Sequence, residues 1–279
     1  SNDSKSIFVS SNENQIVQYD VATGKEINSI KTGKKGNLKL AMNPKLDVIA
    51  AASSSIKIID VATGRKRKLE ASFSGGISAL TFTPCGRFLA AASTRTRELL
   101  VFDTRAETEA DAPVFVLPVR GVVTGIDSKV SKNGEVISLL AVFEDAGAAI
   151  FELDANYSKA QSNGVNLVKL ELNITSAQPI LAASFGSVGN RDDAGVVVAV
   201  GAKSSPVFKH IDLNSAAPAV SGSTNSVVQK VLKLNEHGLV SETTTQVNGA
   251  KAGAEGALFA PEVLGPHEMG GMKRPIVGA

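Results

Sequence analysis

The chain has 279 residues, of which 43% are apolar, 20% charged and 5% aromatic, and its formal net charge at pH 7 is +2. This near-balance of charge and the few aromatic residues give no case for a nucleic-acid-binding module built on a basic face with stacking aromatic rings, so any basic contacts must be local. The single cysteine, Cys85, excludes an internal disulfide and a cysteine-rich zinc site, which favours a reducing compartment. No run approaches about 18 consecutive apolar residues, so we expect a soluble protein without a membrane span.

An internal repeat begins near the N-terminus. The copies read IVQYDVATG at 16–24, IKIIDVATG at 56–64 and, more loosely, LLVFDT at 99–104. Asp20 and Asp60 are therefore 40 residues apart, and Asp103 follows after a further 43. The Pro44 turn returns at Pro84 with the same spacing. A fixed period of this size indicates a repeat architecture.

Within one repeat, short alternating apolar runs are separated by turn residues, a pattern of strands rather than helices. The runs of the second repeat are 38–42, 48–52, 56–61 and 65–71. Four strands in a unit of about 40 residues indicate one blade of a β-propeller. A β-sandwich with coincidental internal similarity is the alternative, because its strand spacings are comparable.

We therefore predict an all-β fold, a WD-repeat-type β-propeller with about five visible blades of a seven-bladed ring. The predicted blades are 5–32, 37–71, 77–118, 121–172 and 179–234 within a partial propeller spanning 1–234. The first blade lacks its opening strand, so we expect residues preceding Ser1 to supply that strand and further blades, and we expect the apolar face and edge of the first blade to be exposed without them. Residues 235–279, rich in Gly, Ala and Pro, are predicted to be a low-complexity, flexible tail or linker.

Three stretches carry a resemblance to a known family. They are residues 14–38 with 77–87, residues 114–152, and residues 179–214. Their order resembles the WD-repeat subunit of the UTP-A (t-UTP) subcomplex of the small-subunit processome, the family of U-three-associated protein five and WD-repeat protein forty-three. The resemblance implies a scaffold of small-subunit ribosome biogenesis and pre-rRNA processing, located in the nucleus and nucleolus. It also implies other propeller proteins as partners and contact with pre-ribosomal RNA.

The sequence offers no set of catalytic, cofactor-binding or metal-binding residues. It has no Trp and only three His, whereas a metal or nucleophile site needs several such groups converging from different blades. The repeated Asp20, Asp60 and Asp103 precede turns, so we interpret them as turn-capping residues rather than catalytic acids. We expect no enzyme activity, no cofactor and no small-molecule substrate.

Two basic clusters are candidate contacts for RNA phosphate or a nuclear-import receptor. One contains Lys31, Lys34 and Lys35 in an inter-blade loop; the other contains Arg65, Lys66, Arg67 and Lys68 on an outer strand. Lysine and arginine neutralise phosphate and release counterions when they bind RNA. The alternative is that the charges only protect an exposed sheet edge from pairing with another chain.

Two further functions stay open beside the ribosome-assembly scaffold. One is a WD-repeat adaptor in another nuclear or cytosolic complex. The other is a lactonase-like propeller enzyme, which the Asp-Val-Ala-Thr-Gly turns also resemble. Such an enzyme requires carboxylates or histidines that converge on the centre of the ring, whereas a scaffold requires only exposed binding surfaces.

Overall fold

The computed structural model describes most of the chain up to Asn248. Outside the described residues lie 2, 12, 34–37, 72, 106–110, 145–146, 158–168, 174–179, 187–194, 203, 213–225, 236–237 and 249–279. The described residues form strands and turns, and no helix among them could cross a membrane. They fall into two compact units: Ser1–Ala141 with Phe151–Lys169, and Val142–Ile150 with the residues from Leu170 onward.

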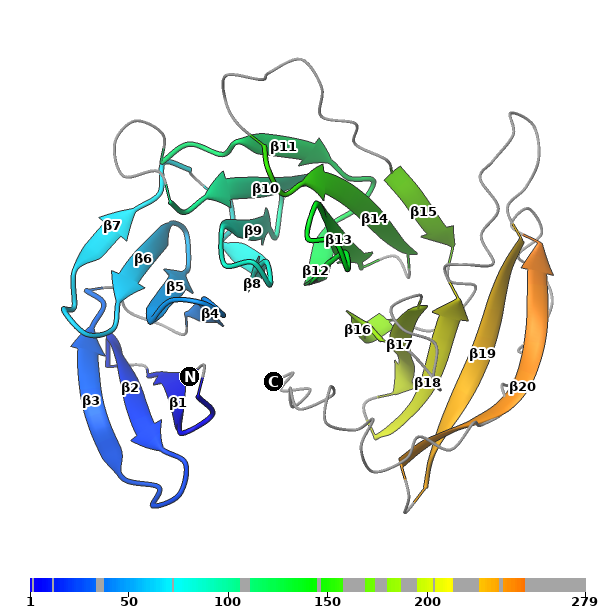
Figure 1. Ribbon diagram of the computed structural model, residues 1–279, viewed down its shortest axis with the longest axis horizontal. Helices are drawn as coiled ribbons and strands as arrows, with labels where there is room; N and C mark the ends of the chain where they lie inside the picture. Colours follow the sequence, from blue (N-terminus) through cyan, green and yellow to red (C-terminus); the bar gives the residue numbers. More distant parts are fainter. Residues whose placement is uncertain are drawn as a thin grey trace. The chain divides into compact units, whose positions relative to one another are not determined.

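Five antiparallel sheets make up the fold, and the strands of each sheet follow one another along the chain (Figure 1). The first sheet has three strands, β1 (Ser6–Ser10), β2 (Gln15–Asp20) and β3 (Glu26–Lys31). The second has four, β4 (Lys39–Met42), β5 (Val48–Ala52), β6 (Ile56–Asp60) and β7 (Lys66–Lys68). Within the part of the chain that the structure describes, the first sheet has no counterpart of β4.

The third and fourth sheets are also four-stranded meanders. The third contains β8 (Ile77–Phe82), β9 (Phe88–Ser93), β10 (Glu98–Asp103) and β11 (Phe115–Pro118). The fourth contains β12 (Val123–Val130), β13 (Val136–Phe143), β14 (Gly147–Asp154) and β15 (Lys169–Asn173). The predicted third and fourth blades span 77–118 and 121–172.

The fifth sheet has one strand more than predicted. It contains β16 (Ile180–Phe185), β17 (Gly195–Ala202), β18 (Ser205–Asp212), β19 (Ser226–Asn235) and β20 (Gly238–Asn248). Because β20 pairs along β19, the predicted tail from residue 235 is wrong for 238–248. That stretch reads GLVSETTTQVN, and its β-branched Val and Thr favour a strand although few of its residues are apolar. The rest of the predicted tail, 249–279, lies outside the described residues.

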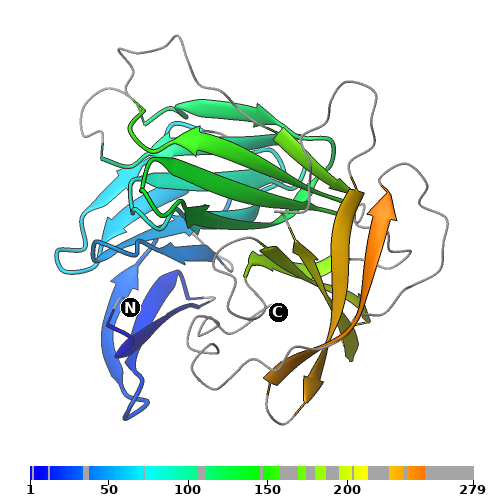
Figure 2. The same ribbon diagram turned by 45° about the vertical axis from the view of Figure 1, so that its right-hand side comes forward.

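Small apolar residues fill the second strand of the second and third sheets. β5 reads VIAAA and β9 reads FLAAAS, and both strands are almost entirely buried. Short side chains on both faces of a strand allow neighbouring sheets to approach closely, and the twisted sheets of the first unit succeed one another in this way (Figure 2). In a half-exposed strand, buried and exposed side chains alternate, whereas nearly every side chain of β5 and β9 is buried.

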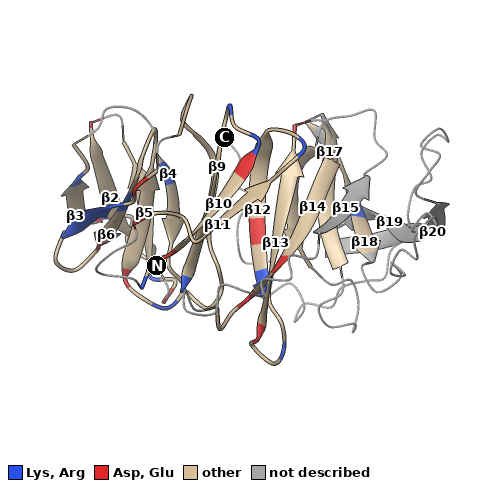
Figure 3. Ribbon diagram, turned by 90° about the horizontal axis from the view of Figure 1, so that it is seen from above, with Lys and Arg blue, Asp and Glu red and all other residues tan. Residues whose placement is uncertain are grey.

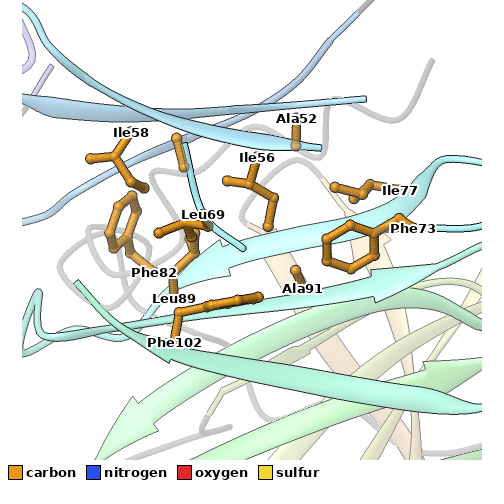
Figure 4. Close-up of a cluster of buried hydrophobic side chains, with 11 residues drawn as sticks. Ala52, Ile56, Ile58, Leu69, Phe73, Ile77, Phe82, Leu89, Ala91 and Phe102 are labelled. Carbon is orange, nitrogen blue, oxygen red and sulfur yellow. The ribbon is translucent and has the colours of Figure 1, made fainter. Parts of the chain in front are cut away.

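The core of the first unit lies between successive sheets. Between the second and third sheets, Ile56, Leu69, Phe82, Leu89 and Phe102 form one buried cluster (Figure 4). Between the first and second sheets the buried side chains are Ile16, Ile30, Ile49, Ala51 and Ile59. Each sheet thus contributes one face to each neighbour.

Candidate interaction surface

The repeated aspartates cap tight turns, as predicted. Asp20 Oδ1 accepts hydrogen bonds from the N–H and the hydroxyl of Thr23, both at 2.7 Å. Asp60 accepts the same pair from Thr63 at 2.7 and 2.8 Å. The following glycines have positive φ, +67° at Gly24 and +68° at Gly64, which an L side chain rarely adopts. The two turns are therefore built identically.

Hydrogen bonding lowers the pKa of both turn aspartates. For Asp20 the main cause is the hydroxyl of Thr23, and for Asp60 it is the N–H of Thr63. Both bonds stabilise the ionised carboxylate and leave no proton to transfer near neutral pH. This environment is that of a structural carboxylate rather than of a general acid.

Asp103 holds a different contact, an ion pair with Arg87. Nε and Nη2 of Arg87 both lie 2.8 Å from Asp103 Oδ2, and the side chains are only 11% and 14% exposed. Burial raises the pKa of Asp103, but the hydrogen bonds from Arg87 and from the N–H of Arg105 outweigh it, so the pKa is lowered overall. The guanidinium also stacks on Phe88, with Cζ 4.5 Å from the ring centroid.

Long cationic side chains tie neighbouring sheets of the first unit together. Lys57 Nζ of the second sheet donates to the Thr32 carbonyl oxygen after the first sheet, at 2.8 Å. In the other direction, Arg67 Nη2 donates to the Thr104 carbonyl oxygen of the third sheet at 2.7 Å. Both donors therefore bind main-chain carbonyl groups of an adjacent sheet.

Arg87 forms the third such tie. Its Nη1 donates to the Ala155 carbonyl oxygen after the fourth sheet's third strand at 2.6 Å, and Nη2 donates to the Tyr157 carbonyl oxygen. Tyr157 packs its ring on Phe115, with centroids 4.6 Å apart. Sequence reasoning missed these residues, because the contacts join positions 68 and 70 residues apart.

The predicted basic clusters are only partly available for binding. Arg65, Lys66 and Lys68 are exposed, and the outer strand β7 forms a blue stretch beside the labels β3 and β6 (Figure 3). Arg67, in contrast, turns toward the third sheet and pairs with Asp111 at 3.1 Å. Lys31 is exposed at the end of β3, and Lys34 and Lys35 lie outside the described residues. Arg67 therefore contacts the third sheet, whereas its three basic neighbours are exposed.

An exposed apolar face covers one side of the first sheet. Ile7 is 53% and Val9 44% exposed, and strand register places them opposite Tyr19 and Val17 of β2. Alternation along a strand puts these four side chains on one face, which we call the outer face of the first sheet; Ile7 and Val9 are exposed there, Tyr19 is half-buried and Val17 is buried. The opposite face carries Ile16 and the other buried residues that meet the second sheet.

In the second unit, His210 of β18 is buried against the start of β17. A Cβ added at Gly195 would lie 1.9 Å from His210 Nε2, so only glycine fits beside the imidazole ring. Burial also lowers the pKa of the neighbouring Lys209. Among the described residues, no three His, Cys, Asp or Glu side chains gather into a group that could hold a metal ion.

No protein-family model and no curated protein sequence matches the chain. Solved structures resemble it in fold. Hydrazine synthase of Kuenenia stuttgartiensis matches with a TM-score of 0.52 and 12% identity over 89% of this chain and 64% of that chain. A chain in the crystal structure of the mitotic checkpoint complex matches with a TM-score of 0.53 and 13% identity over 75% of this chain and 58% of that chain.

These likenesses, together with the five antiparallel sheets, define the class of the protein. It is an all-β protein of the β-propeller type, which confirms the predicted fold class. The chain spans less than two thirds of the length of either solved chain, 64% and 58%. Sequence identities this low concern the fold alone, because propellers of one shape serve many functions.

Proposed function

We propose that the chain is a non-catalytic scaffold of small-subunit ribosome assembly that binds other propeller proteins in the nucleolus. The observation that carries the scaffold function is the pair of exposed apolar side chains, Ile7 and Val9, on the outer face of the first sheet. Adjacent exposed apolar side chains on an ordered sheet are typical of protein-binding surfaces. The ribosomal assignment rests on the sequence resemblance.

The polar side chains support the same function. Asp20 and Asp60 cap turns, and Arg87 and Asp103 join neighbouring sheets. Their hydrogen bonds maintain the fold, so we assign them structural roles. Exposed Arg65, Lys66 and Lys68 provide a secondary contact for pre-ribosomal RNA.

Affinity purification of the full-length protein tests this function. We expect recovery of other propeller subunits of the small-subunit processome, identified by mass spectrometry, together with pre-ribosomal RNA, identified by hybridisation. Val9→Glu on the outer face should reduce the recovery of propeller subunits. Its matched control is Val116→Glu on β11, where the valine side chain is 51% exposed, and this variant should leave the recovery unchanged. Recovery of neither RNA nor propeller subunits by the unmodified protein would contradict the nucleolar assignment.

A further inference from the structure

Exposed cations gather at one end of the first three sheets. Because the strands of each sheet are antiparallel, the last residue of the outer strand and the first residue of the strand before it lie at the same end. β3 finishes there with Lys31, β7 finishes with Lys68, and Arg97 immediately precedes β10. We call this end of the three sheets the basic end; its exposed cations are Lys31, Lys39, Lys68, Arg95, Arg97 and Arg120.

Contacts between neighbouring sheets bring these ends together within the first unit. Lys57 Nζ, near the start of β6, donates to the Thr32 carbonyl oxygen just after β3 at 2.8 Å. Gly76, just before β8, lies against the turn between β5 and β6, where a Cβ added to it would be 3.7 Å from the Ser53 carbonyl oxygen. The three ends therefore form one surface rather than three separate patches.

The cations of the basic end are available to a ligand. Within the part of the chain that the structure describes, no ion pair or side-chain hydrogen bond engages the charged groups of Lys31, Lys39, Lys68, Arg95 or Arg97. Arg67 and Arg87, in contrast, bind carboxylates and main-chain carbonyl groups. Among the described residues, the exposed carboxylates at this end are fewer than the cations; they are Glu13, Glu70 and Glu98.

The opposite end of the same sheets has a different charge pattern. There each sheet carries its turn aspartate, Asp20, Asp60 or Asp103. The pKa of all three is lowered, so they are ionised near neutral pH. Arg105, at that end, lies 3.5 Å from the Asp103 carboxylate. Positive charge is thus concentrated at the basic end, which attracts anions.

The turn between β9 and β10 holds Arg95 in a defined position. Ser93 Oγ donates to the Ser74 carbonyl oxygen at 2.7 Å and accepts the Arg95 N–H at 3.2 Å. A Cβ added to Gly75 would lie 2.8 Å from Cγ and Cδ of Arg95, so the aliphatic part of this side chain packs directly on the Gly75 backbone. A side chain that is ordered before binding loses less conformational entropy when it binds.

We propose that the basic end binds the phosphodiester backbone of RNA, an inference that rests on the proposed contact with pre-ribosomal RNA. Lysine and arginine side chains neutralise phosphate groups, and this interaction does not depend on base sequence. Phe73, the aromatic residue between β7 and β8, is buried and provides no platform for base stacking. The basic end therefore positions RNA without selecting its sequence.

Fluorescence anisotropy with labelled RNA tests this site on the full chain. The probes are oligouridine and oligoadenosine of about 20 nucleotides, which should bind with similar affinity because they share the same backbone. Arg95→Gln combined with Arg97→Gln should weaken binding about tenfold at low salt and reduce its salt slope by about 1.4, because two phosphate contacts of about 0.7 each are lost. Arg95→Lys combined with Arg97→Lys should retain most of the affinity, since a phosphate contact requires the charge.

The matched control removes the same charge from the opposite end. Lys45→Gln combined with Arg105→Gln should leave RNA binding unchanged, because Lys45 lies in the turn between β4 and β5 and Arg105 follows β10. Circular dichroism should show the same fold for all these variants, since the replaced side chains are exposed.

Three results would overturn the assignment of the basic end to RNA. They are equal losses of affinity in the two glutamine double variants, an unchanged salt slope in Arg95→Gln/Arg97→Gln, and competition by oligoglutamate as effective as that by RNA of equal charge. The last result would instead assign the basic end to an acidic protein segment. Recovery of propeller subunits by Arg95→Gln/Arg97→Gln tests the scaffold function separately, so a failed RNA site leaves that function intact.

Discussion

The guanidinium of Arg87 binds the carboxylate of Asp103 at 2.8 Å and, through its remaining N–H groups, the carbonyl oxygens of Ala155 and Tyr157. One side chain thereby joins the third sheet to the segment that follows β14. The pair is largely shielded from water, so the loss of either partner leaves an uncompensated charge.

We therefore expect Arg87→Ala to lower the free energy of unfolding by about 3 kcal/mol, because Asp103 would remain charged and poorly solvated. Urea denaturation with fluorescence or circular dichroism measures this loss. Arg105→Ala is the matched control, since Arg105 is 61% exposed and lies 3.5 Å from Asp103. Equal effects of the two substitutions would contradict the role assigned to Arg87.

Acid should destabilise the protein through the aspartates. The folded-state pKa of Asp20, Asp60 and Asp103 is lowered, so their stabilisation is complete above the unfolded pKa of about 3.9 and disappears as pH falls through the folded values. We expect unfolding free energy to be nearly constant between about pH 7 and 5 and to fall below about pH 4. Urea titrations at each pH measure it, and Asp103→Asn should reduce the slope.

The turn after β6 requires a left-handed residue at position 64. Gly64 has φ +68° and no atom within 4 Å of an added Cβ, so Gly64→Ala tests backbone conformation without a clash. We expect a loss of about 1 kcal/mol in the free energy of unfolding. Gly64→Asn should lose less, because asparagine tolerates this region. An alanine variant as stable as the unmodified protein would show that the turn relaxes.

We expect the exposed cations around β7 to contribute to RNA binding and Arg67 to contribute to the free energy of unfolding. Replacing Arg65, Lys66 and Lys68 with Gln should weaken pre-ribosomal RNA binding and flatten its salt dependence, each lost phosphate contact reducing the slope by roughly 0.7–0.9. Arg67→Gln should instead lower the unfolding free energy, since it breaks the contacts with Asp111 and Thr104. An unchanged salt slope in the triple variant would leave only edge protection for these residues.

The first sheet should be less stable than the third. The first has three strands and an exposed apolar face, whereas the third has four strands and a buried central strand, β9. Repeat proteins are stabilised by contacts between neighbouring units. Hydrogen exchange should therefore show Ile7–Ile30 opening more readily than Ile77–Phe102, and uniform protection of both segments would contradict this expectation.

The strand pattern of the sheets could be predicted because the repeat carries its own markers. Asp20, Asp60 and Asp103 close β2, β6 and β10, and the structure adds Asp154 and Asp212 at the ends of β14 and β18. The last two were not recognised as part of the series, because the residues around them have diverged. β20 was missed because its strand character lies in Thr and Val rather than in an apolar run.

The contacts between sheets could not be predicted in the same way. Arg87 follows an ordinary Thr-Pro-Cys-Gly turn, and its acceptors on Ala155 and Tyr157 are main-chain oxygens that carry no sequence signature. Arg67 appeared as one of four adjacent cations, although its side chain turns to another sheet. Such long-range pairings depend on the three-dimensional neighbourhood, which local periodicity does not encode.

Lys57, Arg67 and Arg87 each donate to a backbone carbonyl oxygen of a neighbouring repeat, and Arg67 also pairs with the Asp111 carboxylate. Every residue type presents the same carbonyl acceptor, so the bonds to the backbone constrain the path of the neighbouring repeat but not its side chains. A repeat held in this way can accumulate substitutions and keep its place beside the donor. The fourth repeat has lost the Asp-Val-Ala-Thr-Gly pattern but keeps its four-stranded sheet. Hydrogen bonds to backbone carbonyl groups permit this, because they do not depend on the sequence of the repeat that accepts them.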